Sequence, residues 1–288
     1  MDHWKNLGFS QVLVLDSVEA VSHRDSAVTI VRLAKVNLGN AQITWIQPVE
    51  GHSVFTGFLG SHGNGAMSLV HRFENQEQLD TELERLADID VNVLDEITIH
   101  TALGDLYYTL MDTREEGKYI LGYTYGDTYP DIRQNLTSDN RHNVKINQYA
   151  FAIRDASAVS RYWEQMGQPE FEINHPVLGN TKYFGELVDH ELIQGWQRHG
   201  SIAYEWCIPV KPPIVYEDHI KAHGEGIHHL AFTVEDMDVA LKDFTSRGYV
   251  NSMGGTWGEE DKPGSGRYEY INLEHAGGVT MELLWNFK

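Results

Sequence analysis

The sequence has little cysteine, few basic residues and no long apolar run. Its single cysteine, Cys207, cannot form an internal disulfide, which is typical of a reducing compartment. The chain has 22 Lys and Arg against 42 Asp and Glu, a net charge of -20, and lacks the clustered basic residues that bind phosphate. We therefore expect no nucleic-acid or membrane partner. Because no signal-peptide pattern or membrane-length segment is present, we expect a cytoplasmic protein.

What the sequence does contain is a duplication. Residues 39–65 align without a gap with residues 200–226, an offset of 161 positions. Near the start of the chain the register slips by two, so that Trp4 falls opposite Trp163. Similarity over this length indicates that the two halves of the chain share one architecture.

A shorter repeat lies within the C-terminal half. Residues 148–155 and 229–236 are alternating apolar runs that predict strands. Each run leads into a predicted helix, 155–167 and 236–248, with Asp at the N-cap position and Gly at the end. Three more predicted strands follow each helix. The repeating unit is therefore βαβββ, and the C-terminal half holds two of them.

These repeats divide the chain into two domains joined by a linker. The length of 288 residues and the 41% hydrophobic content suit two globular cores. Residues 126–144 are rich in turn-forming residues and have no periodicity, so we interpret them as the linker. The predicted domains are then 1–125 and 145–288.

Four polar residues occupy equivalent places on the predicted strands. If the first and fourth strands of both C-terminal units line one concave sheet, each strand directs one such side chain into a shared cleft. The candidates are Gln148, Glu205, His229 and Glu282. Burying these groups on otherwise apolar strands is costly unless something binds them. We therefore predict that they hold a divalent metal ion, and that His228, the next residue on its strand, points the other way.

The N-terminal copy lacks these residues. Under the offset of 161, the counterparts of the last three candidates are Thr44, Ser68 and Leu121. The counterpart of Gln148 would lie before Met1. We therefore expect residues 1–125 to form a degenerate domain of the same fold, without metal ligands.

The motifs that carry the candidates resemble those of the vicinal oxygen chelate superfamily, which includes glyoxalase I, methylmalonyl-CoA epimerase, extradiol dioxygenases and fosfomycin-resistance enzymes. INQYAFAIRD (146–155) is similar to the family's opening strand, which usually has His where this chain has Gln148. The other matching stretches are YEWCIP (204–209), GEGIHHLAFTVED (224–236) and GGVTMELL (277–284). The resemblance implies an α+β fold of tandem βαβββ modules in two pairs, with the first module incomplete.

The resemblance also implies the chemistry. With one histidine and two glutamates, the ligand set resembles that of glyoxalase I more than the two-histidine iron site of the dioxygenases. We therefore expect a metal-dependent epimerase or isomerase that moves a proton beside the carbonyl of a small molecule, with Glu282 and Glu205 as the catalytic acid and base. Zn, Mn, Co, Ni or Mg would serve as the ion, and Fe is the weaker candidate.

Other readings stay open at this point. The first alternative is a glyoxalase-type lyase, followed by an extradiol-type dioxygenase and a non-catalytic protein that sequesters a ligand. The resemblance also leaves a homodimer open. A further glutamate of the epimerases has two candidate counterparts, Glu186 and Glu191.

Overall fold

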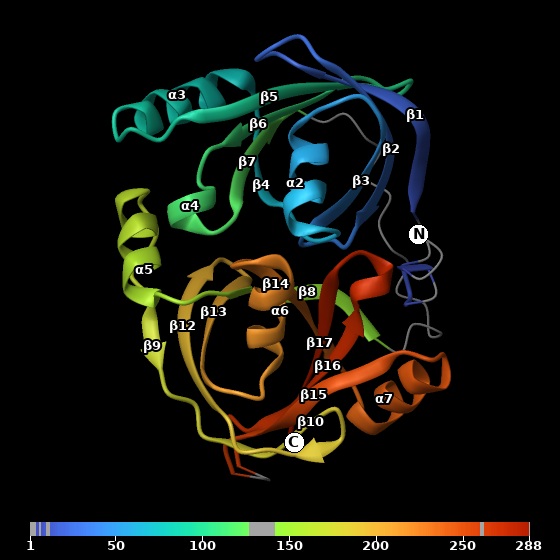
Figure 1. Ribbon diagram of the computed structural model, residues 1–288, viewed down its shortest axis with the longest axis vertical. Coiled ribbons are helices and arrows are strands. Elements are labelled where there is room, and N and C mark those ends of the chain that lie inside the picture. The colour runs from blue at the N-terminus through green and yellow to red at the C-terminus, as the bar shows by residue number, and fades with distance from the viewer. Residues whose placement is uncertain (1–3, 6, 10–11, 127–141, 260–261, 288) are drawn as a thin grey trace.

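The protein folds into two curved sheets, one from each half of the chain (Figure 1). The computed structural model describes residues 4–5, 7–9, 12–126, 142–259 and 262–287. The architecture is the α+β arrangement expected from the repeats. Among the described residues, no helix has both the length and the apolar character needed to cross a membrane.

The N-terminal half forms a seven-stranded sheet in the order β3-β2-β1-β5-β6-β7-β4. Its strands are β1 (Leu13–Ser22), β2 (Val28–Asn37), β3 (Gln42–Glu50), β4 (Ser68–Phe73), β5 (Val93–His100), β6 (Leu106–Met111) and β7 (Ile120–Tyr125). Its helices are α2 (Val54–His62), α3 (Gln76–Ala87) and α4 (Arg114–Gly117).

The C-terminal half forms a ten-stranded sheet in the order β11-β10-β15-β16-β17-β14-β8-β13-β12-β9. Its strands are β8 (His142–Ala152), β9 (Glu172–Asn174), β10 (Leu178–Tyr183), β11 (Glu186–Leu187), β12 (Glu191–His199), β13 (Ile202–Lys211), β14 (Gly226–Val234), β15 (Val250–Trp257), β16 (Gly266–Leu273) and β17 (Val279–Asn286). Its helices are α5 (Ala156–Gln165), α6 (Val215–His223), α7 (Met237–Ser246) and the short 3₁₀ helix η1 (Glu274–Ala276).

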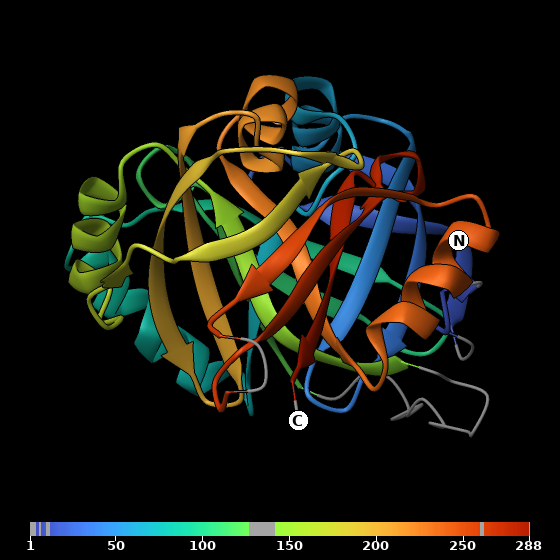
Figure 2. The same cartoon turned by 90° about the horizontal axis from the view of Figure 1, so that it is seen from below.

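The secondary structure repeats as the sequence does. Helix α6 lies 161 positions after α2, and the two helices lie side by side where the halves meet (Figure 2). In three modules the first strand pairs in parallel with the last, as β4 with β7, β8 with β13 and β14 with β17. Helices α5 and α7 begin at the expected caps, because Asp155 and Asp236 accept hydrogen bonds from the backbone of Ala158 and Val239.

The first module contributes only three strands to its sheet. In the C-terminal half the two modules join through their first strands, β8 and β14. In the N-terminal half β1 pairs with β5 instead, so that the modules join through their second strands. The joint has moved because, among the described residues, no strand precedes β1 to make the usual contact.

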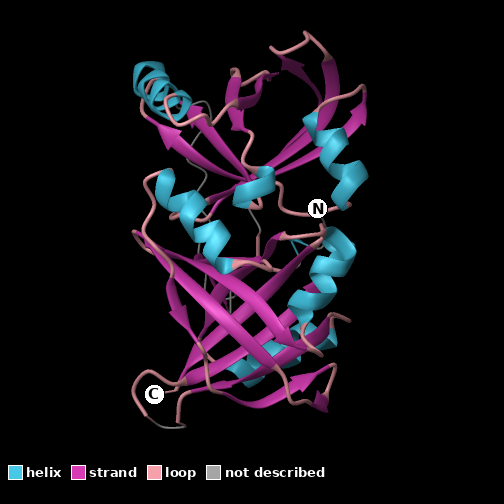
Figure 3. Ribbon diagram, turned by 60° about the vertical axis from the view of Figure 1, so that its left-hand side comes forward, coloured by secondary structure: helices cyan, strands magenta, loops and turns pink. Residues whose placement is uncertain are grey.

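The apolar cores cross the boundary between the halves. Helices α5 and α7 flank the C-terminal sheet on its outer side (Figure 3). Trp4 is buried in a cluster with Phe232 and Met237 of the C-terminal half, and its indole nitrogen donates to the carbonyl oxygen of Ala276 at 2.6 Å. The predicted linker lies mostly outside the described residues, and strand β8 begins at His142.

Candidate metal centre

The four candidate ligands stand on four neighbouring strands in the middle of the C-terminal sheet. In sheet order β17, β14, β8 and β13 carry Glu282, His229, Gln148 and Glu205. Ala150 pairs with both Glu205 and His229, and Ala231 pairs with both Gln148 and Glu282. Alanine between the ligand positions leaves room for the longer side chains to converge on one face of the sheet.

The four side chains meet at hydrogen-bonding distance. The amide nitrogen of Gln148 donates to Oε2 of Glu205 at 3.0 Å and to Oε2 of Glu282 at 3.2 Å. Nε2 of His229 lies 3.4 Å and 3.2 Å from the same two oxygens. One ligand atom each of Glu205, His229 and Glu282 can be chosen within 4.8 Å of the others, which is close enough to share an ion.

The burial and charge of this group fit a divalent cation. Glu205, His229 and Glu282 are 2%, 0% and 3% exposed. Two carboxylates and one imidazolium leave a buried negative charge, whereas two carboxylates, a neutral imidazole and a divalent ion are balanced. Nε2 of His229 also forms no hydrogen bond of good geometry, although it faces both carboxylates. Such a buried and unsatisfied nitrogen is the expected state of a ligand atom.

Opposing effects act on the titration of this cluster. Burial alone would lower the pKa of His229, but the carboxylates of Glu282 and Glu205 outweigh it and raise this pKa to about 9. Burial raises the pKa of Glu282, against the opposing effect of His229. A cation bound here would take the place of the proton that these shifts attract.

A β-bulge brings His228 to the same site. Strand β14 pairs Ile227 with Phe151 but His229 with the next residue, Ala150, so His228 is an extra residue in the ladder. Its Nδ1 lies 2.9 Å from Nδ1 of His229. The prediction that His228 points away was wrong, because it assumed unbroken alternation. Burial lowers the pKa of His228 well below its usual value, so its ring is neutral and its Nδ1 can accept a hydrogen bond that orients the ring of His229.

Two further residues, Gln194 and Tyr270, lie around the centre, and the sequence patterns gave no indication of Gln194. Gln194 on β12 donates a hydrogen bond to Oε1 of Glu205. Tyr270, which pairs with Glu282 across β16 and β17, forms a hydroxyl contact of 2.5 Å with Tyr216 of α6. Both residues reach the centre through contacts between neighbouring strands or distant segments, which local sequence patterns do not record. Glu186 and Glu191, the two glutamates considered as counterparts of the further epimerase glutamate, are both exposed.

In the N-terminal half, different residues stand at the corresponding positions. Thr44 pairs with Lys35 as Glu205 pairs with Trp196, and Lys35 is buried. Gly122 pairs with Val70 as Glu282 pairs with Ala231, the counterpart of Val70 under the offset of 161. The structural counterpart of Glu282 is therefore Gly122 and not Leu121, because the pairing of β7 is shifted by one residue. A side chain at Gly122 would meet Oγ of Ser68 at 2.8 Å, which places these two residues on the same face.

The chain is similar to known proteins in both sequence and fold. Residues 147–263 match the profile of the Glyoxalase/Bleomycin resistance protein/Dioxygenase superfamily. A mutant of 4-hydroxymandelate synthase from Streptomyces coelicolor is 12% identical, with a TM-score of 0.62 over 100% of this chain and 89% of that chain. This likeness shows that the fold of both halves is shared.

Two further solved structures are similar over smaller parts of the chain. Methylmalonyl-CoA epimerase from Mycobacterium tuberculosis is 16% identical, with a TM-score of 0.38 over 54% of this chain and 95% of that chain. The Mn(II)-bound glyoxalase from Novosphingobium aromaticivorans is 14% identical, with a TM-score of 0.44 over 77% of this chain and 63% of that chain. No curated protein sequence matches the chain. Residues 147–263 of this chain therefore match the glyoxalase, bleomycin resistance protein and dioxygenase superfamily, and the fold of the chain as a whole is shared with the 4-hydroxymandelate synthase structure.

Proposed function

We propose that this protein is a divalent-metal-dependent epimerase or isomerase that transfers a proton beside the carbonyl group of a small substrate. The observation that carries the proposal is the pair of buried carboxylates, Glu205 and Glu282, which flank a single imidazole. Gln148 and His229 complete the set that would hold the ion. Two carboxylates offer one group to remove a proton and a second to return it.

Each side chain has a part in this scheme. A bound divalent ion supplies positive charge that polarises the substrate carbonyl and makes the adjacent C–H bond more acidic. We assign removal of the proton to Glu282, because it accepts fewer amide hydrogen bonds than Glu205, and each such bond makes a carboxylate a weaker base. Glu205, which accepts hydrogen bonds from Gln148 and Gln194, is held in place to return the proton.

The surroundings of the centre favour a small substrate. Helix α6 lies on the concave side of the sheet (Figure 1). Tyr216, Tyr268 and Tyr270 pack with Cys207 in one buried cluster beside the carboxylates. The substrate classes to test are thioesters, sugar-like ketones and hemithioacetals.

A glyoxalase-type lyase is the second candidate, because the same four ligand types would serve it. It differs from the epimerase in its product, since the lyase moves a proton between adjacent carbons and turns a hemithioacetal into a 2-hydroxy thioester, whereas epimerisation inverts one carbon. Both reactions require proton transfer next to a carbonyl, and product analysis distinguishes them.

The test is exchange of substrate hydrogen in heavy water. Metal-loaded protein is incubated with a panel of ketones, thioesters and hemithioacetals, and deuterium beside the carbonyl is measured by mass spectrometry. The native protein should introduce deuterium into at least one class. Glu282→Gln, which keeps the shape and an oxygen ligand, should reduce exchange by about 10²-fold or more.

The matched control is Glu191→Gln, which changes an exposed glutamate on the strand that carries Gln194. This variant should exchange as the native protein does. Equal loss of exchange in both variants would contradict the role of Glu282. Oxygen uptake with a turned-over substrate and no exchange would replace the proposal with a dioxygenase reaction.

A further inference from the structure

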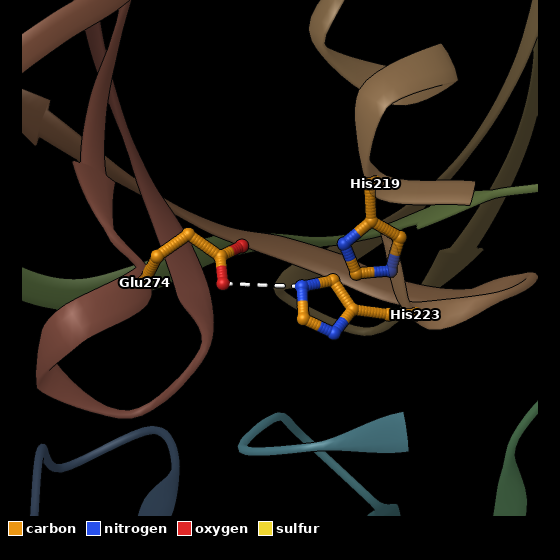
Figure 4. Close-up of side chains that lie close together, drawn as sticks. All are labelled: His219, His223 and Glu274. Carbon is orange, nitrogen blue, oxygen red and sulfur yellow. Dashed lines mark hydrogen bonds and ion pairs between the residues drawn. The ribbon is translucent and has the colours of Figure 1, made fainter. Parts of the chain in front are cut away.

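A second group of metal-ligating side chains lies where the two halves meet. His219 and His223 are one turn apart on α6, and Glu274 lies in η1, between β16 and β17 (Figure 4). One ligand atom from each of the three can be chosen within 4.8 Å of the others. Two histidines at positions i and i+4 present their rings on one helix face, as in known zinc sites. We propose that His219, His223 and Glu274 bind a second divalent transition-metal ion, with Zn²⁺ as the best fit.

The hydrogen bonds of His223 point to a cation beside it. Its Nδ1 lies 2.6 Å from the carbonyl oxygen of His62, which can only accept, so Nδ1 carries the proton. Nε2 then presents a lone pair to Oε2 of Glu274, 3.1 Å away. Two such lone pairs face each other only if a proton or a metal ion lies between them. A ring that donates to a backbone carbonyl through one nitrogen is also the usual arrangement of a metal-bound histidine.

His219 supplies the third donor. It is 8% exposed, and its ring centroid lies 5.1 Å from that of His223. Imidazole nitrogen is a common ligand of divalent transition metals. His219 thus adds a third donor to the pair formed by His223 and Glu274.

The site has room for a fourth ligand. A cavity of about 60 Å³ adjoins the cluster and is lined by His62, His219, His223 and Gly278. A cavity of this size holds a water molecule, which would complete a tetrahedral zinc site.

An ion in this place would join two parts of the C-terminal half beside the N-terminal half. It would link α6 to the turn before β17, next to the His62 carbonyl of the N-terminal half. The ring of His219 also packs edge-on against His228, at 5.1 Å between centroids. The second ion would therefore hold α6 in place over the candidate centre, without sharing a ligand with it.

Titration with metal tests the proposal. Protein freed of metal with a chelator is titrated with Co²⁺ and Zn²⁺, and bound metal is measured by mass spectrometry and Co²⁺ absorption. The native protein should bind two equivalents, one of which gives the intense visible bands of four-coordinate Co²⁺. His223→Gln retains a hydrogen-bond donor for His62, so it should fold. It should lose those bands and bind one equivalent of metal about 100-fold more weakly or worse. Even the loss of a residue that only supports a ligand lowers metal affinity 10- to 100-fold.

Three further variants separate this site from other sources of binding. Glu274→Gln changes a side chain that is 44% exposed, so it should not affect the fold. It should likewise lose the intense Co²⁺ bands and bind one equivalent of metal more weakly. His229→Ala should lose the other equivalent and keep the intense bands. His100→Gln is the matched control, because His100 and Asp105 form an exposed pair at 3.0 Å that resembles the one between His223 and Glu274. It should bind metal as the native protein does.

The outcomes are distinguishable. A single equivalent in the native protein that is lost in His229→Ala would overturn the second site and leave the proposed function standing. Two equivalents that both survive in His223→Gln and Glu274→Gln would also overturn it. Intense bands that persist in His229→Ala and disappear in both of the other variants would support it, whether or not the protein turns over any substrate.

Discussion

The indole nitrogen of Trp163 donates a hydrogen bond to the carbonyl oxygen of Gly117 at 3.2 Å, which joins α5 of the C-terminal half to α4 of the N-terminal half. Trp4 makes the reciprocal bond to the carbonyl oxygen of Ala276, in the corresponding connection of the other half. These are the two tryptophans that the repeat aligns with a slip of two residues. The incomplete first module has therefore kept the contact that its tryptophan makes with the opposite half.

The packing around Gly117 predicts that this position tolerates no larger side chain. A Cβ atom there would lie 2.6 Å from Cζ2 of Trp163 and 2.9 Å from Cε1 of Tyr162. Gly117→Ala should therefore lower the free energy of unfolding by about 1–3 kcal/mol, the usual cost of overpacking. Denaturant unfolding provides the measurement. As a control, Gly57→Ala on α2 should stabilise by about 0.5–1 kcal/mol, because a Cβ there meets nothing within 4 Å. An equal response of the two variants would argue against the predicted clash.

Lys35 should reduce stability at neutral pH. Burial, and then the charge of Arg72, lower the pKa of Lys35 to about 8. The ammonium form is thus penalised in the folded protein below this pH, and the penalty disappears as pH rises from about 8 to the unfolded value of about 10.4. Lys35→Met should raise the free energy of unfolding at pH 7 by up to about 3 kcal/mol. The gain should shrink above pH 8. Lys182→Met, at an exposed position, should show no such pH dependence.

His228 should tune the metal affinity of the candidate centre without binding the ion. His228→Phe keeps a ring of similar size but removes the acceptor that lies 2.9 Å from Nδ1 of His229. We expect the affinity for Zn²⁺ to fall by about 10- to 100-fold, the usual effect of losing a residue that orients a ligand. Isothermal titration of metal-free protein measures this change. Unchanged affinity would mean that the bulge serves packing alone.

Gln148 should influence which metal the centre prefers. An amide oxygen and two carboxylates suit Mg²⁺ and Mn²⁺, whereas imidazole suits Fe²⁺, Ni²⁺ and Zn²⁺. Gln148→His should therefore shift the preference from the first group toward the second, as measured by competition between Mn²⁺ and Ni²⁺. Gln194→His is the comparison, because Gln194 contacts Glu205 from the neighbouring strand. If both variants shifted the preference equally, Gln148 would not be a ligand.

Much of the architecture could be read from the sequence because its signals are local or repeated. The alternation of apolar residues before Asp155 and Asp236 predicts strands that enter capped helices, and both caps are present. The offset of 161 positions correctly relates α2 to α6, since a duplicated chain buries the same pattern of side chains twice. The same repeats led to Gln148, Glu205, His229 and Glu282, whose side chains lie together in the structure.

Other features depended on contacts between distant parts of the chain. The bulge at His228 and the shifted register of β7 at Gly122 arise from pairing with a neighbouring strand, so a period of two residues cannot reveal them. The convergence of His219, His223 and Glu274 likewise requires the turn before β17 to lie beside α6. Local sequence patterns indicate which residues tend to be buried and which tend to form turns. The positions of side chains from separate strands and helices are set by how the whole sheet closes around its core.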